Sequence, residues 1–217
     1  LLMGEAKKGN RLQSWGYGEA KKNIEQWSVD RAIIKYDDRT VAFVQILQKK
    51  LFGILNLIRI NRGPIFLEEQ DPKIKIAVIK KLVDQLSNVS RGRVLSIAAE
   101  LNFCDESVSI QKECRIFRIK RGMKSVWINL SEQHQILRKK LSGNWRSKYI
   151  SIEREDLKIE ISEESEVFEW LLKQSSEMMK ERRADKIPTE LYRAYRKELL
   201  QEKRSIFIVR ANYRGQP

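Results

Sequence analysis

The sequence predicts a mixed α/β fold, and three observations favour it. Apolar strand-like runs fill the first part of the chain around one amphipathic helical stretch. The second part has the order strand, helix, helix, strand. No linker rich in Pro, Gly or Ser separates the two parts, so we expect two closely packed domains. We predict a first domain over residues 1–130. Residues 131–217 then hold a basic connecting helix and the beginning of a second, incomplete domain.

The first part begins with a short predicted helix over residues 18–26, to which Trp15, Ala20 and Ile24 offer apolar surface. A second helix over residues 71–89 starts at Asp71-Pro72, because Pro is favoured in the first helical turn. Runs rich in β-branched residues predict strands at 27–38, 40–51, 51–66, 94–101, 115–120 and 125–130.

The second part begins with a predicted helix that Ser131 caps. Apolar residues recur in it every four positions, and Gly143 makes a break possible because Gly costs about 1 kcal/mol relative to Ala. The apolar positions expected to be buried are Leu137, Leu141, Trp145 and Tyr149.

A strand at 157–162, a helix capped by Ser162, a helix starting at Pro188 and a strand at 205–211 complete the pattern. The last strand is followed by a turn, and such a turn normally leads to a partner strand. We therefore expect the sequence to be a fragment cut within its second domain.

The charge balance favours a polyanionic partner. Lys and Arg number 43 against 29 Asp and Glu, a formal net charge of +14. Such a surplus suits nucleic acid, an anionic membrane or a phosphate-bearing substrate. Residues 137–148 contain no acid, and we expect their bases on the outer faces of the helix, facing a tRNA acceptor arm or a membrane surface. A solvated helix is the alternative. These bases are Arg138, Lys139, Lys140, Arg146 and Lys148.

Several classes of site are disfavoured. Cys104 and Cys114 are too few for a disulfide scaffold or a zinc knuckle, and His134 is the only histidine, so we expect no metal and no His-based triad. No apolar run approaches the roughly 20 residues of a membrane-spanning helix. We expect a cytoplasmic protein that at most contacts the inner face of the membrane.

The stretch QSWGYGEAKK, from Gln13, fits the pattern Q-x-x-G-x-G. GNAT acetyltransferases use that pattern after a strand, where backbone N–H groups bind the pyrophosphate of acetyl-coenzyme A. Only twelve residues precede Gln13 and no strand is among them. We therefore predict that this stretch is not a cofactor loop.

A second resemblance covers more of the chain. QSWGYGEAKK, Trp27, VAFVQIL, RGPIF and the pattern L-R-K-K-L-x-x-x-W-R occur in an order that resembles the Fem (FemABX) family, from about Leu12 to the end. This family builds the interpeptide bridges of bacterial peptidoglycan. The resemblance implies tandem GNAT-like domains, each a mixed sheet flanked by helices. It also implies transfer of an amino acid from aminoacyl-tRNA, the co-substrate, to the amine of a lipid-linked or UDP-linked peptidoglycan precursor. No other cofactor is implied.

The resemblance also implies roles for single residues. Lys21, eight residues after Gln13, is expected at the phosphates of the precursor, on the exposed side of its helix. Arg62, beside Gly63-Pro64, is expected to reach into a cleft, and Arg182 and Arg183 are candidates for a second phosphate contact.

Some family members carry an acidic residue in the strand predicted at 94–101, at positions that correspond to Ala98 and Ala99 here. Either Glu100, which follows, takes its place and accepts the proton of the attacking amine, or this chain works without that acid and a group of the substrate accepts the proton. Attack on an activated ester needs mainly positioning and stabilisation of the oxyanion, and no covalent nucleophile is evident.

Two other functions stay open. One is a coenzyme A-dependent GNAT-like N-acyltransferase that acts on another cell-envelope or small-molecule amine, with acetyl-coenzyme A as co-substrate. The other is a non-enzymatic RNA-binding module, which would carry aromatic side chains on exposed strands.

Overall fold

A computed structural model describes residues 9–87, 93–99, 103–119, 128–153, 155 and 157–213. They form two compact units. The first holds the described residues up to Ile119 together with Pro188–Arg204, and the second holds those from 128 to Ile187 and from Ser205 onward. The domain boundary predicted at residue 130 stays a prediction, but the return of 188–204 to the first unit was not foreseen.

The first unit is built on a mixed sheet, which confirms the predicted α/β class. Its strands have the order β1-β2-β3-β5, with β4 paired to β2, and only the β3–β5 pair is parallel. The strands are β1 (Ser28–Tyr36), β2 (Arg39–Leu51), β3 (Leu55–Asn61), β4 (Ile65–Phe66) and β5 (Arg93–Ala98).

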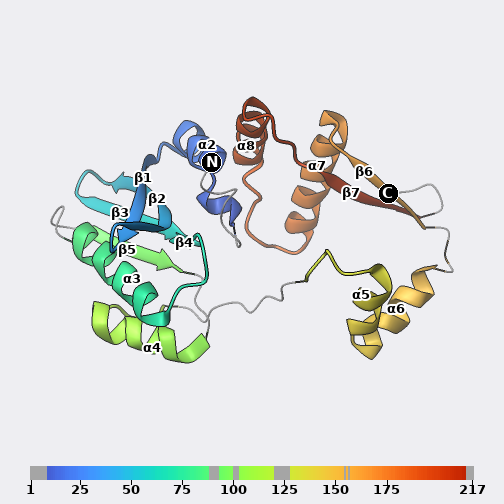
Figure 1. Cartoon of the computed structure of the whole chain (residues 1–217). Helices are drawn as coiled ribbons and strands as arrows, with labels where there is room; N and C mark the ends of the chain where they lie inside the picture. Colours follow the sequence, from blue (N-terminus) through green and yellow to red (C-terminus); the bar gives the residue numbers. More distant parts are fainter. Residues whose placement is uncertain are drawn as a thin grey trace. The chain divides into compact units, whose positions relative to one another are not determined.

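One face of this sheet is covered by α3 (Pro72–Ser87), the crossover helix that a parallel β3–β5 pair requires. Alternate residues of β2 and β3 point toward it, among them Val44 and Ile58, and pack with Val78 and Leu82. Figure 1 shows α3, and α4 beyond it, on this side.

Helix α4 (Phe103–Cys114) was not predicted, and it packs on α3 around Ile79, Val83, Ile110 and Cys114. The strand predicted at 115–120 is wrong over residues 116–119, which have no regular structure. The predicted strand at 125–130 lies mostly outside the described residues, and residues 128–130 are not a strand.

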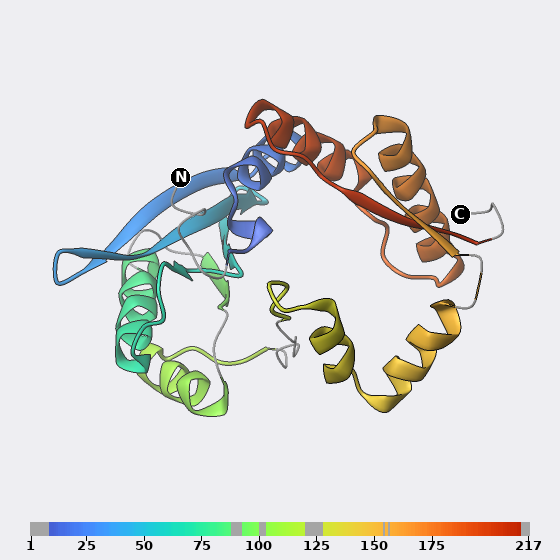
Figure 2. The ribbon, with the colours of Figure 1, turned by 45° about the vertical axis from the view of Figure 1, so that its right-hand side comes forward.

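The other face carries α2 (Trp15–Glu25), preceded by the 3-10 turn Arg11–Gln13. The helix starts before the predicted Gly18 because the hydroxyl of Ser14 caps it, accepting from the Tyr17 N–H at 3.3 Å. Helix α8 (Thr189–Gln201) lies beside α2 in both ribbon views, and the rings of Tyr17 and Tyr195 meet edge to face at 6.0 Å (Figures 1 and 2).

Gln13 fastens α2 to the sheet. Its side chain is only 4% exposed, and its amide nitrogen donates to the carbonyl of Asn61 at 2.6 Å and to that of Gln45 at 3.3 Å. Its amide oxygen accepts from the Gln45 N–H at 2.6 Å. One side chain therefore satisfies backbone groups of both β2 and β3 at the point where α2 begins.

The second unit contains the antiparallel pair β6 (Leu157–Ser162) and β7 (Ile208–Tyr213), with α7 (Ser165–Glu181) packed on β7. These elements agree with the predicted order, although Glu164 rather than Ser162 stands at the N-cap of α7. The helix predicted from Ser131 is instead two helices, α5 (His134–Lys140) and α6 (Gly143–Glu153), with the break immediately before Gly143.

We expect Gln13→Ala to lower the free energy of unfolding by about 2–4 kcal/mol, because it leaves buried backbone groups of Gln45 and Asn61 unpaired and opens a void. Chemical denaturation followed by circular dichroism measures this. Gln135→Ala, at an exposed position of α5, is the control and should change stability by less than about 0.5 kcal/mol. Equal effects of the two variants would contradict the structural role given to Gln13.

Gly63→Ala should also destabilise, by about 1–3 kcal/mol. A Cβ at Gly63 would lie 2.6 Å from the amide carbon of Gln13, which its hydrogen bonds hold in place. A Cβ at Gly143 would meet nothing within 4 Å, so Gly143→Ala is the matched control and should be neutral or slightly stabilising. Thermal unfolding of both variants tests this, and an unchanged Gly63→Ala melting temperature would count against the close approach.

Candidate functional site

The glycines of QSWGYG lie inside α2, and their lack of side chains lets the helix pack closely on two sides. A Cβ at Gly18 would lie 2.3 Å from the side-chain oxygen of Gln45, and a Cβ at Gly16 would lie 3.2 Å from Cβ of Glu198 in α8. The stretch is thus a packing surface between the sheet and α8 and not a pyrophosphate loop.

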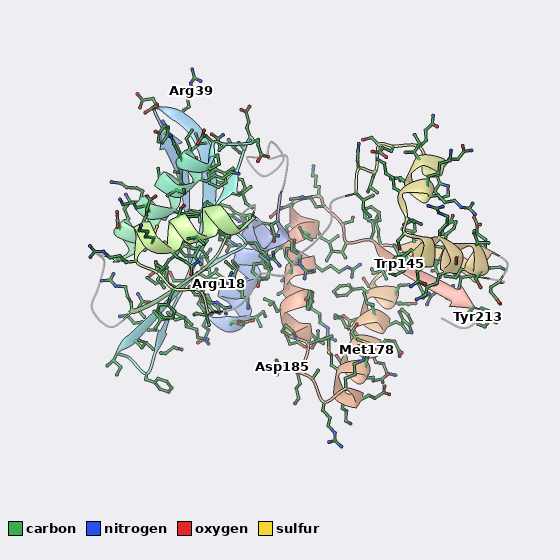
Figure 3. All side chains as sticks on the ribbon, turned by 90° about the horizontal axis from the view of Figure 1, so that it is seen from below. Arg39, Arg118, Trp145, Met178, Asp185 and Tyr213 are labelled. Atoms are coloured by element: carbon green, nitrogen blue, oxygen red, sulfur yellow. The ribbon has the colours of Figure 1, made fainter. Side chains whose placement is uncertain are left out.

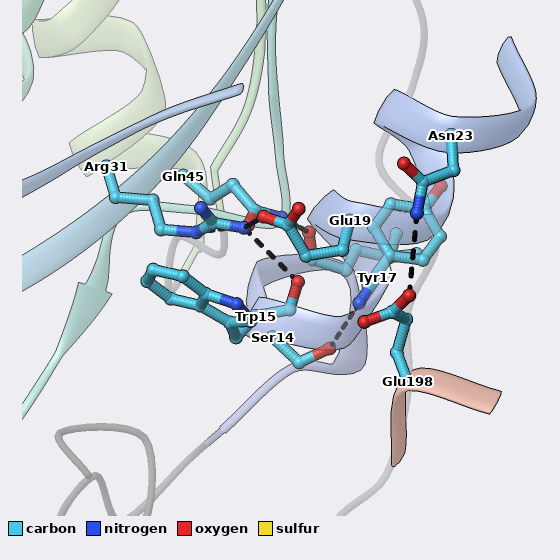
Figure 4. A network of polar contacts seen from close by, with 9 residues as sticks. Ser14, Trp15, Tyr17, Glu19, Asn23, Arg31, Gln45 and Glu198 are labelled. Carbon is cyan, nitrogen blue, oxygen red and sulfur yellow. Dashed lines mark hydrogen bonds and ion pairs between the residues drawn. The ribbon is translucent and has the colours of Figure 1, made fainter. Parts of the chain in front are cut away.

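A polar network ties α2 to the sheet (Figure 4). The guanidinium of Arg31 lies over the Trp15 indole at 3.7 Å, pairs with Glu19 at 2.8 Å and donates to the Gln45 side chain at 3.1 Å. On the other side Asn23 reaches Glu198 of α8. These contacts fix the orientation of α2, and so of every side chain that α2 carries.

Near the C-terminal end of α2, Lys21 pairs with Glu25, and two further cations from the sheet lie close by. Lys21 Nζ donates to Glu25 at 2.6 Å, and the second oxygen of Glu25 accepts from the Trp27 indole at 3.1 Å. Lys49 of β2 donates to the backbone carbonyl of Glu25 at 2.8 Å. Both Lys49 and Arg59 approach the Trp27 ring, at 5.9 and 6.0 Å from its centroid.

Strand register explains why Lys49 and Arg59 meet. Arg59 of β3 pairs with Leu47 of β2, so Arg59, Leu47 and Lys49 lie on the same face of the sheet, the face that carries α2. Arg59 is exposed, and within the described residues its guanidinium makes no hydrogen bond or ion pair. Its donors are therefore available to a ligand.

Tyr17 extends this group toward α8. Burial, followed by the charge of Glu25, raises the pKa of the Tyr17 phenol, although Arg59 and Arg11 act in the opposite direction. The phenol therefore stays protonated at neutral pH and can donate. Within the described residues its hydroxyl has no hydrogen-bond partner. Arg11 lies over the ring of Tyr192, at 5.8 Å.

We name this set of side chains the basic–aromatic cluster. It consists of Arg11, Tyr17, Lys21, Glu25, Trp27, Lys49, Arg59 and Tyr192.

The sheet surface beyond the cluster is open in the part of the chain that the structure describes. Val94 of β5 is 46% exposed and Ala98 is exposed, and both lie on the same face as Arg59. Ala99 packs on the opposite side, against the core between α3 and α4. Of the two alanines, Ala98 is therefore the one on the α2 side. Glu100 lies outside the described residues.

The structure places the predicted phosphate-binding residues as follows. Lys21 is not on the exposed side of α2: its side chain is 13% exposed and is held by Glu25. Arg62 is half-buried and has a left-handed backbone (φ 53°). It follows Asn61, whose carbonyl accepts a hydrogen bond from Gln13 just before α2 begins. Arg182 and Arg183 are exposed at the C-terminal end of α7, in the second unit.

The basic segment forms two short successive helices, α5 and α6, and its predicted burial pattern is wrong. Neither α5 nor α6 contains a buried residue, and Trp145 projects from α6 with 65% of its surface exposed (Figure 3). Arg146 of α6 links it to the end of α5 by donating to the carbonyls of Lys139 and Leu141, at 2.8 and 3.0 Å.

Acidic side chains compensate part of the positive charge of α5 and α6. Arg138 pairs with Glu153 at 3.0 Å, and Lys140 donates to Glu132 at 2.6 Å. Lys139 and Lys148 make no ion pair with any described residue, and Lys148 lies 5.6 Å from the Trp145 ring centroid. The uncompensated charge thus lies beside an exposed aromatic ring.

No group of three described His, Cys, Asp or Glu side chains is arranged to hold a metal ion. Cys114 is buried in the α3–α4 core, where burial raises the pKa of its thiol. Among the described helices, none is long and apolar enough to cross a membrane.

Comparison with known proteins supports the fold. No protein-family model matches the chain, and no curated protein does. The crystal structure of FemX is similar over 96% of this chain, with a TM-score of 0.64 and 18% sequence identity. The chain spans about half of that protein, 54% of its length. This likeness agrees with the GNAT-like α/β fold that the sequence resemblance implies.

Sequence reasoning found Lys21 but missed Tyr17, Lys49 and Arg59. A signal was present: Lys49 and Arg59 lie in two strands rich in apolar residues, where a charged side chain needs a partner or water. Their meeting depends on register, which the sequence did not reveal.

We expect Lys21→Met to raise the pKa of Glu25. Burial alone raises that pKa, but hydrogen bonds from Lys21 and Trp27 outweigh burial and hold it below the ordinary carboxyl value. Titration of the Glu25 carboxyl carbon by NMR measures the change.

The sign for stability follows from the lowered pKa. The contribution of the ion pair is complete above the ordinary carboxyl pKa and is lost as the pH falls through the lowered folded-state value. As the pH falls from the ordinary carboxyl pKa through the lowered pKa of Glu25, the free energy of unfolding of Lys21→Met should therefore decrease less than that of the unchanged protein. An unaltered Glu25 titration in the variant would show that Lys21 does not hold the carboxylate.

Proposed function

We propose that this protein is an aminoacyltransferase of the Fem type, which transfers an amino acid from aminoacyl-tRNA to the amine of a lipid-linked or UDP-linked peptidoglycan precursor. The observation that carries the proposal is the basic–aromatic cluster on a fold similar to that of FemX. The ordered sequence resemblance to the Fem family supports it independently.

The cluster suits a diphosphate. It sets four cations against the single carboxylate of Glu25, and Coulomb attraction to a dianion is strong where surrounding side chains exclude part of the water. Arg59 offers a guanidinium fork, which matches phosphate oxygens in two parallel hydrogen bonds. Tyr17 adds a neutral donor. In this arrangement Lys21 supplies charge, and Glu25 holds Lys21 and Lys49 in position.

Helices α5 and α6 suit the tRNA. Lys139 and Lys148 provide charge for the phosphate backbone, and Trp145 provides a surface for stacking on an unpaired nucleotide. The donor ester is already activated, so the protein contributes chiefly by holding the amine and the ester together and by stabilising the oxyanion.

The test is transfer of radiolabelled amino acids from a mixture of aminoacyl-tRNAs to lipid-linked precursor, with and without ribonuclease. A parallel reaction supplies acetyl-coenzyme A. Ribonuclease-sensitive label in the precursor supports the proposal and identifies the donor. Acetylation of an amine without transfer from tRNA would overturn it in favour of a coenzyme A-dependent transferase.

Arg59→Ala and Lys21→Ala should each lower kcat/KM for the precursor by about ten- to hundredfold, the loss expected for a charge-assisted phosphate contact. Lys22→Ala is the matched control, because Lys22 is the exposed neighbour of Lys21 on the same helix. Thermal unfolding of each variant separates a folding defect from a binding defect. Equal activity of the Arg59 and Lys22 variants would remove the cluster from the precursor site.

A further inference from the structure

The turn between β2 and β3 carries a residue that its backbone disfavours. Phe52 and Gly53 both have left-handed backbones, with φ of 52° and 73°, and the Ile54 N–H donates to the Leu51 carbonyl at 3.3 Å. Residues 52–54 connect the two strands, since Leu51 pairs with Leu55. Consecutive left-handed positions in a hairpin turn favour Asn-Gly or Asp-Gly, because a left-handed conformation costs a bulky residue free energy. The sequence nevertheless has Phe at the first position.

The apolar side chains of this turn have no packing role in the first unit. Phe52 is 93% exposed and Ile54 is 83% exposed, and a Cβ at Gly53 would meet nothing within 4 Å. Asn at position 52 would remove both the backbone strain and the exposed ring. Contacts among the described residues thus give no reason for Phe52, and an exposed apolar tip rimmed by polar residues is typical of a protein or membrane interaction site.

The hairpin that carries this tip is strongly basic. Residues 39–67 contain five Lys and Arg and no Asp or Glu. Lys49 and Lys50 are consecutive on β2, so they project from opposite faces of the ribbon and flank the tip on both sides. Lys50 stands two residues from Phe52, about 7 Å along a strand, since each residue advances roughly 3.3 Å.

We propose that the tip of the β2–β3 hairpin inserts into the surface of an anionic phospholipid bilayer. Phe52 and Ile54 enter the boundary between headgroups and acyl chains, a layer that side chains penetrate by about 5–10 Å. Lys49 and Lys50 then lie at the level of the lipid phosphates. Lys49 already donates to the Glu25 carbonyl, but it keeps its charge.

A protein partner fits this tip less well. Specific protein interfaces bury about 800 Å² on each partner, whereas two side chains on a projecting turn offer far less. A lipid surface needs no complementary groove, and an aromatic ring with flanking lysines is the combination that the bilayer interface favours. The proposal does not depend on the proposed function, because membrane binding can be measured without any transfer reaction.

The experiment is flotation of the purified protein with vesicles of phosphatidylcholine alone or phosphatidylcholine mixed with phosphatidylglycerol. We expect binding to the anionic vesicles that weakens as salt is added. Phe52→Asn should reduce the partition coefficient about tenfold or more, because the buried ring is lost. Lys50→Gln should reduce it about fivefold, as expected for one lysine near an anionic surface.

The variants keep the test independent of folding. Phe52→Asn creates the favoured Asn-Gly turn, so the hairpin should be at least as stable as before. Phe117→Asn is the matched control, since Phe117 is 83% exposed beside Arg118 but does not stand in a hairpin turn. It should leave binding unchanged.

Three results would overturn the proposal. One is absence of binding to anionic vesicles, and another is equal loss of binding in the Phe52 and Phe117 variants. The third is a protein that light scattering shows to be a dimer and that Phe52→Asn makes monomeric, which would identify the tip as a contact between copies of the chain.

Discussion

The side-chain amide of Gln13 is the contact on which the position of α2 depends. It bonds to the backbone of Gln45, in the middle of β2, and of Asn61, the last residue of β3. The start of α2 is thereby fixed on the sheet, and the two helical glycines allow the remainder to lie close to it. Lys21 and Tyr17 are thereby carried on a rigid helix, and rigid supports place side chains more accurately than loops do.

The secondary structure of the first unit was largely predictable, because apolar alternation and helical spacing are local properties of the sequence. Strands β1 to β3 and helix α3 were expected close to where they lie. Helix α4 was missed because its apolar spacing is weak, and the strand expected after it was wrong. The candidate site was predicted only at Lys21. Arg59 required the register of β2 and β3, and Tyr195, whose contact with Ser14 spans 181 positions, required tertiary structure.

The positive charge of the protein serves different ends in different places. In the basic–aromatic cluster, Glu25 restrains two lysines while Arg59 keeps free donors, so charge is held in a defined geometry. On α5 and α6, half-exposed ion pairs of small energetic value compensate part of the charge, and Lys148 lies beside the exposed ring of Trp145. At the β2–β3 turn, charge flanks an apolar tip. A single count of +14 would not distinguish these three uses.

The return of α8 to the first unit has a consequence for how the protein is made. The surface of α2 that includes Gly16 and Tyr17 is completed only by residues 188–204, far downstream of the sheet they cover. During synthesis the chain emerges from the ribosome with its sheet residues first, so that flank of α2 must wait, uncovered, while the whole second unit up to Ile187 is translated. A chaperone could bind this flank of α2 on the nascent chain. The time for which the flank stays exposed would depend on how fast residues 119–204 are translated.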